Sequence, residues 1–204
     1  RMDLNPQWVI PRSIVEKSIV KHAGDSAYFA QHRYFVRERK SGKRVAPHRV
    51  TASMLASSNY FVIQEGGEGN SLGRIIFRFD NNFSVFIHYT SAPDVFERSS
   101  RDVSHGCIRV ERPLDLAVFL LKEKEEELID RIGYSMTVDL ETDDEDIKKE
   151  KSEKLLHSLK VEPQIPLFIT YYTIYPDLQG HLQQYSDVYG YDGVIYKELR
   201  NYTE

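Results

Sequence analysis

The chain contains a single cysteine, Cys107, which stands in the segment Ser104-His105-Gly106-Cys107. A lone cysteine excludes an internal disulfide framework and a multi-cysteine zinc site. Free cysteines are most often small buried hydrophobic residues, so a reactive role has to be argued from the neighbouring residues. If residues 105–107 are extended, His105 and Cys107 project to the same side, because strand side chains alternate. Gly106 then leaves room for a ligand.

A nucleophilic cysteine needs a base within hydrogen-bond reach, and acyl transfer needs N–H donors where the oxyanion forms. His88 lies near the end of the β-rich segment 83–90, and a strand beside the one that carries Cys107 would bring the imidazole against the sulfur. We expect a helix to start just after Cys107, and its N-terminal end would favour the thiolate. The N–H of Cys107, with that of Gly106 or a neighbour, is the predicted oxyanion donor.

A zinc site is a second way to use the same residues. His88, His105 and Cys107 would provide three protein ligands, which together with a water suffice for a catalytic zinc ion. No carboxylate that would orient a ligating histidine is apparent in the sequence. We therefore expect no metal and no cofactor.

Three short helices are predicted in the first 60 residues, each beginning at a residue that caps helix N-termini well. These residues are Ser13, with Glu16 three positions later, then Asp25 and Thr51. The expected helices cover 11–20, 25 to about 35, and 51 to about 57, with a polar loop at 40–49. These elements would lie over the rest of the fold.

The remaining chain predicts two hairpins, a helix and a charged segment. Residues 74–79 and 83–90 flank Asp80-Asn81-Asn82, which has good turn chemistry, and a glycine-rich turn region at 64–73 precedes them. A second hairpin is expected over 164–175 and 180–185. The helix starts at Pro113, and residues 139–160 are expected to be a charged helical insertion. The predicted fold is mainly β with peripheral helices (α+β), in one domain over 1–204.

Composition narrows the function classes. The 204 residues carry 27 Lys plus Arg against 31 Asp plus Glu, a net charge of −4, so no global basic field exists to attract nucleic acid. We expect no nucleic-acid partner. No apolar run approaches the roughly 20 residues that are needed to span a bilayer.

His88 is followed by 15 residues and then by Ser104-His105-Gly106-Cys107. This arrangement resembles the L,D-transpeptidase, or YkuD-type, family, in which a histidine is followed by 14 to 17 residues, Ser or Thr, and His-Gly-Cys. The likeness extends over 4–14, 70–79, 87–117 and 166–180, which are similar to the larger, periplasmic branch of Gram-negative L,D-transpeptidases. In that branch a lid follows the Trp-containing stretch, so residues 12–62 are the expected lid.

The resemblance assigns roles to individual residues. Cys107 matches the nucleophile, His88 its base, and His105 the motif histidine that lines the site. Gly106 and Cys107 contribute oxyanion N–H groups, the Tyr89 carbonyl orients His88, and Ser104 belongs to the same orienting group. Arginines are added by their chemistry, because guanidinium groups bind carboxylates bidentately. The candidates to hold a substrate carboxylate are Arg109, where some family members have Asn, Arg101 and Arg74.

Family domains begin with several strands ahead of the Asn-Pro-x-Trp stretch, and nothing in this chain supplies them. The expected fold is therefore an L,D-transpeptidase-like β-sandwich that lacks its N-terminal strands. An unprotected sheet edge would follow, with a strand-exchanged or edge-paired homo-oligomer as its predicted consequence.

The resemblance implies an enzyme that forms a thioester on Cys107 with a peptidoglycan stem peptide and expels D-alanine. An amine of a second stem then takes the acyl group, which cross-links two third residues in the periplasm or cell envelope. Carbapenems are expected to acylate such an enzyme. Two alternatives stay open at this point: hydrolysis of the thioester, as in a carboxypeptidase or endopeptidase, and a non-catalytic wall-binding module.

Overall fold

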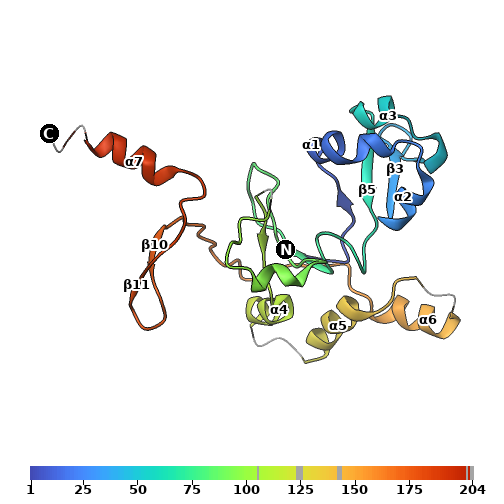
Figure 1. Cartoon of the computed structure of the whole chain (residues 1–204). Coiled ribbons are helices and arrows are strands. Elements are labelled where there is room, and N and C mark those ends of the chain that lie inside the picture. The colour runs from blue at the N-terminus through green and yellow to red at the C-terminus, as the bar shows by residue number, and fades with distance from the viewer. Residues whose placement is uncertain (105, 123–125, 142–143, 201, 203–204) are drawn as a thin grey trace. The chain divides into compact units, whose positions relative to one another are not determined.

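The structure is a computed structural model, and it describes residues 1–104, 106–122, 126–141, 144–200 and 202. The chain divides into two compact units, Arg1–Ile165 and Pro166–Glu204, and each is described by itself. The fold is α+β, as predicted, with more residues in helices than in strands (Figure 1). The assignment of 1–204 to one domain stays a prediction.

A five-stranded sheet in the first unit carries the segments around His88 and Cys107. Its order is β8-β7-β6-β1-β9, and all neighbours are antiparallel except β7 and β8, which run parallel. The predicted hairpin is present as β6 and β7, whose Ile and Phe residues favour strands. The five strands are β1 (Met2–Leu4), β6 (Ile75–Phe77), β7 (Ile87–His88), β8 (Ile108–Arg109) and β9 (Ser158–Leu159).

One face of this sheet packs against helices. Helix α4 (Pro113–Leu121) begins at the predicted proline, and α5 (Glu126–Thr137) follows it. Apolar side chains from strands and helices form one core here, and the opposite face is left for the site. The buried members of this core are Met2, Leu4, Ile75, Phe77, Ala117, Leu121 and Ile132.

The start of α4 corrects the expectation of a helix immediately after the cysteine. Cys107 is followed directly by β8, and α4 begins only at Pro113. Ile108 and Val110 are β-branched and donate to the carbonyls of Phe86 and His88, so the chain continues as a strand. Cys107 therefore does not stand at the N-terminus of a helix.

A second, antiparallel sheet has the order β2-β5-β3-β4, and its strands β3, β4 and part of β5 lie in the expected lid region, 12–62. It packs with short helices around a separate core that includes Val15, Ile19, Phe29 and Val62. The lid region is thus an α+β body (Figure 1). Its strands are β2 (Trp8–Val9), β3 (Tyr34–Glu38), β4 (Arg44–Val45) and β5 (Tyr60–Gln64). Its helices are α1 (Arg12–Ile14), η1 (Val15–Ile19), η2 (Val20–His22), α2 (Ser26–Gln31), η3 (Pro47–Arg49) and α3 (Ala52–Ala56).

Helix caps in this region were predicted well and helix lengths less well. The side chain of Asp25 accepts from Tyr28 N at 3.0 Å, and that of Thr51 accepts from Met54 N at 3.2 Å. The helix after Asp25 was expected to reach Phe35, which is wrong, because Arg33 takes a left-handed φ of 55° and ends the helical turn. Phe35 lies in β3.

Two other expectations for this region also need correction. The first helix starts at Arg12 after Pro11 and has no side-chain cap, so Ser13 does not cap it. The loop expected at 40–49 contains β4, which pairs with β3.

The charged segment at 139–160 contains a helix and then rejoins the main sheet. Helix α6 (Glu145–Lys154) is capped by Asp144, whose side chain accepts from Ile147 N. The following strand β9 pairs with β1, with Met2 opposite Leu159. The end of this segment is therefore part of the sheet, while its boundaries as an insertion stay a prediction.

The second unit holds the predicted C-terminal hairpin and one further helix. Strands β10 (Ile174–Pro176) and β11 (Leu182–Gln184) are antiparallel, and α7 (Tyr191–Arg200) follows them. Many of its large apolar side chains are exposed, Phe168 and Leu178 among them.

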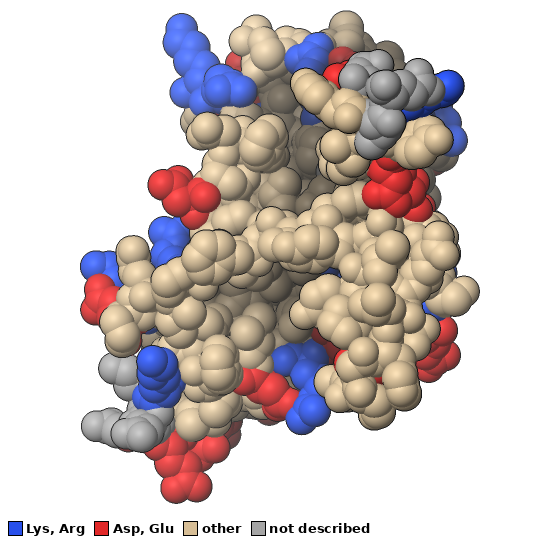
Figure 2. Space-filling view, turned by 90° about the vertical axis from the view of Figure 1, so that its left-hand side faces the viewer, with Lys and Arg blue, Asp and Glu red and all other residues tan. Residues whose placement is uncertain are grey.

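Figure 2 shows a face of the molecule that is mostly uncharged, with charged side chains mainly toward its margins. Among the described residues, no helix is long and apolar enough to cross a membrane.

Candidate active site

The parallel pairing of β7 and β8 brings four side chains to one face of the sheet. Ile87 lies opposite Ile108, and His88 opposite Arg109. Because side chains alternate along a strand, Phe86, His88, Cys107 and Arg109 share the face opposite the helices α4 and α5. All four line one cavity of about 980 Å³.

The other wall of this cavity comes from the lid region. Trp8, Tyr34 and Tyr60 line it, together with the start of the first helix and Leu55 of α3. The cavity therefore lies within the first unit, between the sheet that carries Cys107 and the smaller α+β body. Aromatic walls with a few convergent polar groups are typical of small-molecule and peptide sites.

Cys107 is partly exposed and has a donor aimed at its sulfur. The thiol is free, and Phe86 N lies 3.4 Å from Sγ in hydrogen-bond geometry. A backbone N–H in this position stabilises negative charge on sulfur, and the thiolate is the nucleophilic form of cysteine. The donor beside the sulfur is thus a backbone N–H from the neighbouring strand segment, where the sequence predicted a helix N-terminus.

Ser104 and Gly106 shape the turn that presents Cys107. Ser104 Oγ donates to the Cys107 carbonyl at 2.7 Å and accepts from Gly106 N at 3.1 Å. Gly106 has a φ of +126°, which L side chains rarely adopt, so glycine is required here. Since the Gly106 N–H is engaged by Ser104, the Cys107 N–H is the better placed of the two predicted oxyanion donors. His105 falls outside the described residues.

His88 is buried, with a side-chain contact that fixes its tautomer. Its relative exposure is 5%, and Nδ1 is in hydrogen-bond contact with the Tyr89 carbonyl. A carbonyl only accepts, so Nδ1 carries the proton and Nε2 is left with a free lone pair. The histidine can therefore act as a base through Nε2.

Burial lowers the pKa of His88 from its ordinary value of 6.5. The Tyr89 carbonyl opposes this shift of the pKa, the Arg109 guanidinium adds to it, and the Leu72 carbonyl opposes it. Desolvation and a nearby cation both disfavour the imidazolium. His88 is thus neutral near pH 7, as a general base has to be.

Gly73 allows the close approach that holds Tyr89 in place. A Cβ on Gly73 would lie 2.7 Å from the Tyr89 Cβ, which is closer than side-chain carbons come. Gly73 also has a φ of +70°. The glycine-rich turn at 64–73 is therefore packed against the residue that orients His88, and does not serve as a flexible linker.

Buried amides hold this turn. Asn70 is 1% exposed, donates to the carbonyls of Pro6 (3.2 Å) and Glu65 (2.8 Å), and accepts from Leu72 N at 2.8 Å. Gln64 accepts from Ser71 N at 2.9 Å. These bonds fix Leu72, whose carbonyl faces His88.

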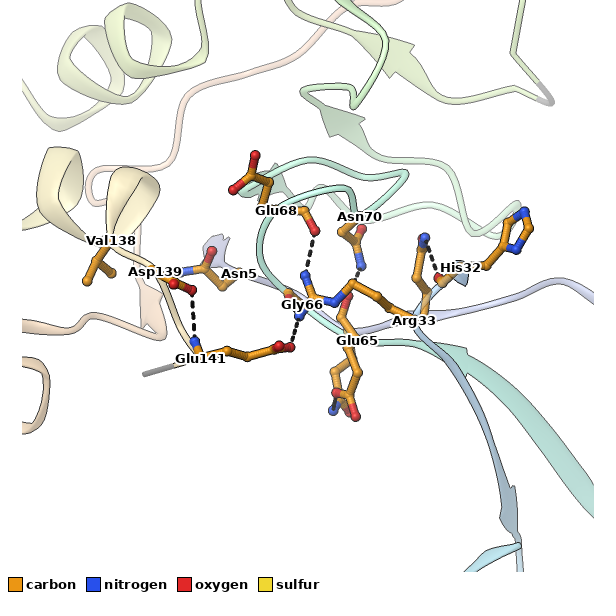
Figure 3. Close-up of polar contacts among 12 residues, drawn as sticks. Asn5, His32, Arg33, Glu65, Gly66, Glu68, Asn70, Val138, Asp139 and Glu141 are labelled. Atoms are coloured by element: carbon orange, nitrogen blue, oxygen red, sulfur yellow. Dashed lines mark hydrogen bonds and ion pairs between the residues drawn. The ribbon is translucent and has the colours of Figure 1, made fainter. Parts of the chain in front are cut away.

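Arg33 ties the same turn to the segment that follows α5. Its guanidinium donates to the Glu68 carbonyl at 2.5 Å and to the Gly66 carbonyl at 3.1 Å, and it pairs with Glu141 at 2.6 Å (Figure 3). Asn5 donates to the Ser135 carbonyl at 2.6 Å from the other side. Arg33 thus links the turn to the segment after α5, and Asn5 links the end of β1 to α5.

The predicted substrate arginines separate into two groups. Arg109 lines the cavity, whereas Arg74 and Arg101 are not among its lining residues. Arg74 donates to the Val138 carbonyl at 2.7 Å and to Asn5, and Arg101 donates to the carbonyls of Phe96 and Arg98. Both of these side chains hold the backbone, so the structure gives no support to a substrate role for them.

Sequence reasoning missed three cavity arginines, Arg12, Arg39 and Arg78. They come from segments that are far apart in the chain, and no motif marks them. Alternation along the strand was the available signal for Arg78 alone, since it follows β6 on the face that carries Ile76 and His88.

The described residues offer no metal site. Among them, no three His, Cys, Asp or Glu side chains are grouped so as to hold an ion. The zinc alternative included His105, which lies outside the part of the chain that the structure describes.

Comparisons with known proteins give two findings. The family model described as "YkuD: L,D-transpeptidase catalytic domain" matches residues 1–136, which include His88 and Cys107. A curated Haemophilus influenzae protein named "Putative L,D-transpeptidase" is 26% identical over 195 residues. That alignment covers 94% of this chain and 36% of the relative, so the chain spans about a third of the relative's length.

Proposed function

Since the chain belongs to the L,D-transpeptidase catalytic-domain family, we propose that it cross-links peptidoglycan stem peptides through a thioester on Cys107. The observation that carries the proposal is the shared cavity. His88 and Cys107 reach it from adjacent parallel strands, and the Tyr89 carbonyl leaves the His88 Nε2 free as a base.

The proposed reaction begins with proton transfer from the thiol of Cys107 to Nε2 of His88. The thiolate attacks the carbonyl of the third stem residue, and the Cys107 N–H stabilises the oxyanion. His88 then returns its proton to the departing amine, which leaves as D-alanine, and the thioester is formed. His105 is proposed to line the site, as the resemblance implies.

The second half of the reaction transfers the acyl group. The side-chain amine of a second stem attacks the thioester, His88 takes the proton from that amine, and the Cys107 thiolate is released. The product is a cross-link between two third residues. This substrate places the proposed site of action in the cell envelope.

Weighing the products tests the proposal. The protein is incubated with muropeptides that carry tetrapeptide stems, and the products are identified by mass spectrometry. A dimer that has lost one D-alanine supports transfer, and the Cys107→Ala variant is expected to form none. Tripeptide alone, without a dimer, contradicts transfer and indicates hydrolysis.

Carbapenem exposure tests the covalent step separately. We expect one adduct on Cys107, which is read without ambiguity because the chain has no other cysteine. Muropeptide binding by a folded protein that forms no adduct would contradict the enzyme and favour a wall-binding module.

A further inference from the structure

The cavity at Cys107 carries positive charge without compensating acids in its lining. Four arginines line it, Arg12, Arg39, Arg78 and Arg109, and no Asp or Glu is among the described lining residues. A concave, partly desolvated site with one sign of charge concentrates ligands of the opposite sign. The ligand is therefore expected to be an anion.

Three of these arginines already have partners. Arg12 pairs with Glu16 at 2.8 Å, and Arg78 pairs with Asp3. Arg39 donates to the Ser58 carbonyl at 3.0 Å and lies over the Phe61 ring. Arg12 and Arg78 are thus neutralised by carboxylates, and the Nε of Arg39 is already satisfied.

Arg109 differs from the other three. Its Nε is buried and has no hydrogen-bond partner among the residues that the structure describes. No carboxylate in that part of the chain forms an ion pair with its guanidinium. A buried, unpaired donor is costly, so it marks a place where a ligand group completes the site.

The position of Arg109 fits one particular ligand group. It follows Cys107 by two residues on the same strand face, roughly 7 Å along the chain. It also lies opposite His88 in the register. In a peptide donor, the C-terminal carboxylate is one residue beyond the attacked carbonyl, about 3.5 Å away. An arginine side chain at position 109 is long enough to span the remaining distance to this carboxylate.

We propose that Arg109 is a specificity-determining residue that binds the C-terminal carboxylate of the donor's departing residue. This inference rests on the proposed function, since it names the part of the donor peptide that the cavity recognises. A guanidinium binds a carboxylate through two parallel hydrogen bonds, which fixes both the charge and the direction of the ligand. A donor that ends in an amide binds less well, because it has no negative charge and only one acceptor oxygen, so the pair of parallel hydrogen bonds cannot form.

Two alkylating reagents test this on the thiol alone. Iodoacetate carries a carboxylate and iodoacetamide does not, and the rate of Cys107 modification by each is read from intact mass. We expect the iodoacetate-to-iodoacetamide rate ratio to fall about tenfold in Arg109→Gln, since the positive charge that attracts the carboxylate of iodoacetate is lost. A ratio within twofold of the wild type overturns the proposal.

The controls separate charge from fold. Arg109→Lys keeps the charge, so its ratio is expected to stay within about threefold of the wild type. Arg101→Gln removes an exposed arginine outside the cavity and should leave the ratio unchanged. If Arg109→Gln does not fold, a competition experiment on the wild type tests the proposal. N-acetyl-D-alanine should then slow alkylation by iodoacetamide more than N-acetyl-D-alaninamide does, and equal effects overturn the proposal.

Donor peptides connect the inference to the reaction. The wild type should acylate on a tetrapeptide with a free C-terminus about 10- to 100-fold faster than on its C-terminal amide, and Arg109→Gln should lose this preference. Cross-linking that shows no carboxylate preference refutes this inference alone. A carboxylate effect on alkylation without any cross-linking refutes the proposed function and leaves the role of Arg109 standing.

Discussion

Replacing Asn70 by alanine should destabilise the fold and disturb the site at the same time. The side chain is 1% exposed and makes three hydrogen bonds, to the Pro6 and Glu65 carbonyls and from Leu72 N. Alanine leaves all three backbone groups unpaired in the interior, at about 1 kcal/mol or more each. We expect a loss of about 3 to 4 kcal/mol, a large share of the stability of an ordinary domain.

Urea denaturation measures this loss as a fall in the midpoint at an unchanged slope. Asn82→Ala is the matched control, because Asn82 is exposed in the β6–β7 loop, and it should change stability by less than about 0.5 kcal/mol. Asn70→Ala should also slow carbapenem acylation of Cys107, since Leu72 faces His88. A loss below about 1 kcal/mol in Asn70→Ala would refute the claim that this amide holds the turn.

The remaining predictions concern the base and the residues around it. The lowered pKa of His88 means that acylation of Cys107 should persist as pH falls through 6.5 and decline only below it. The contribution of His88 to the free energy of unfolding changes in the same direction. It is complete above pH 6.5 and is lost at lower pH as His88 becomes protonated. A pH–rate profile that already declines above 7 contradicts this. Gly73→Ala should slow acylation at least tenfold by displacing Tyr89. Gly69 has a similar φ, but an added Cβ there would meet open space, so Gly69→Ala should lower stability by only about 1 kcal/mol and leave activity unchanged. Equal effects of the two would exclude the Tyr89 contact. Ser104→Ala should lower the acylation rate by loosening the Gly106 turn, with exposed Ser99→Ala as the control.

Local features of the fold were predictable from the sequence. Asp25 and Thr51 cap helices through their own side chains, and the β6–β7 hairpin joins segments that are close in the chain. Features set by distant pairing were not predictable. The pairing of β1 with β9 joins Met2 to Leu159, and nothing local marks either residue as a strand partner.

The candidate site also divides into features that the sequence predicted and features that depend on distant pairing. The spacing of His88 and Cys107 and the resemblance it carries pointed to two residues that line one cavity, and the Tyr89 contact was expected from that resemblance. The contact from Phe86 N to the sulfur was missed, because it depends on a parallel register that sequence alone does not give. The start of the helix at Pro113 was predicted, but the strand that two β-branched residues form between Cys107 and this helix was not.

Intact mass measured during the reaction with a tetrapeptide donor tests the account most directly. The wild type is expected to gain the mass of the donor minus D-alanine, on a peptide that contains Cys107, and His88→Ala should gain it far more slowly. A folded protein that turns over the donor with no such adduct, or equally fast without His88, would contradict the account.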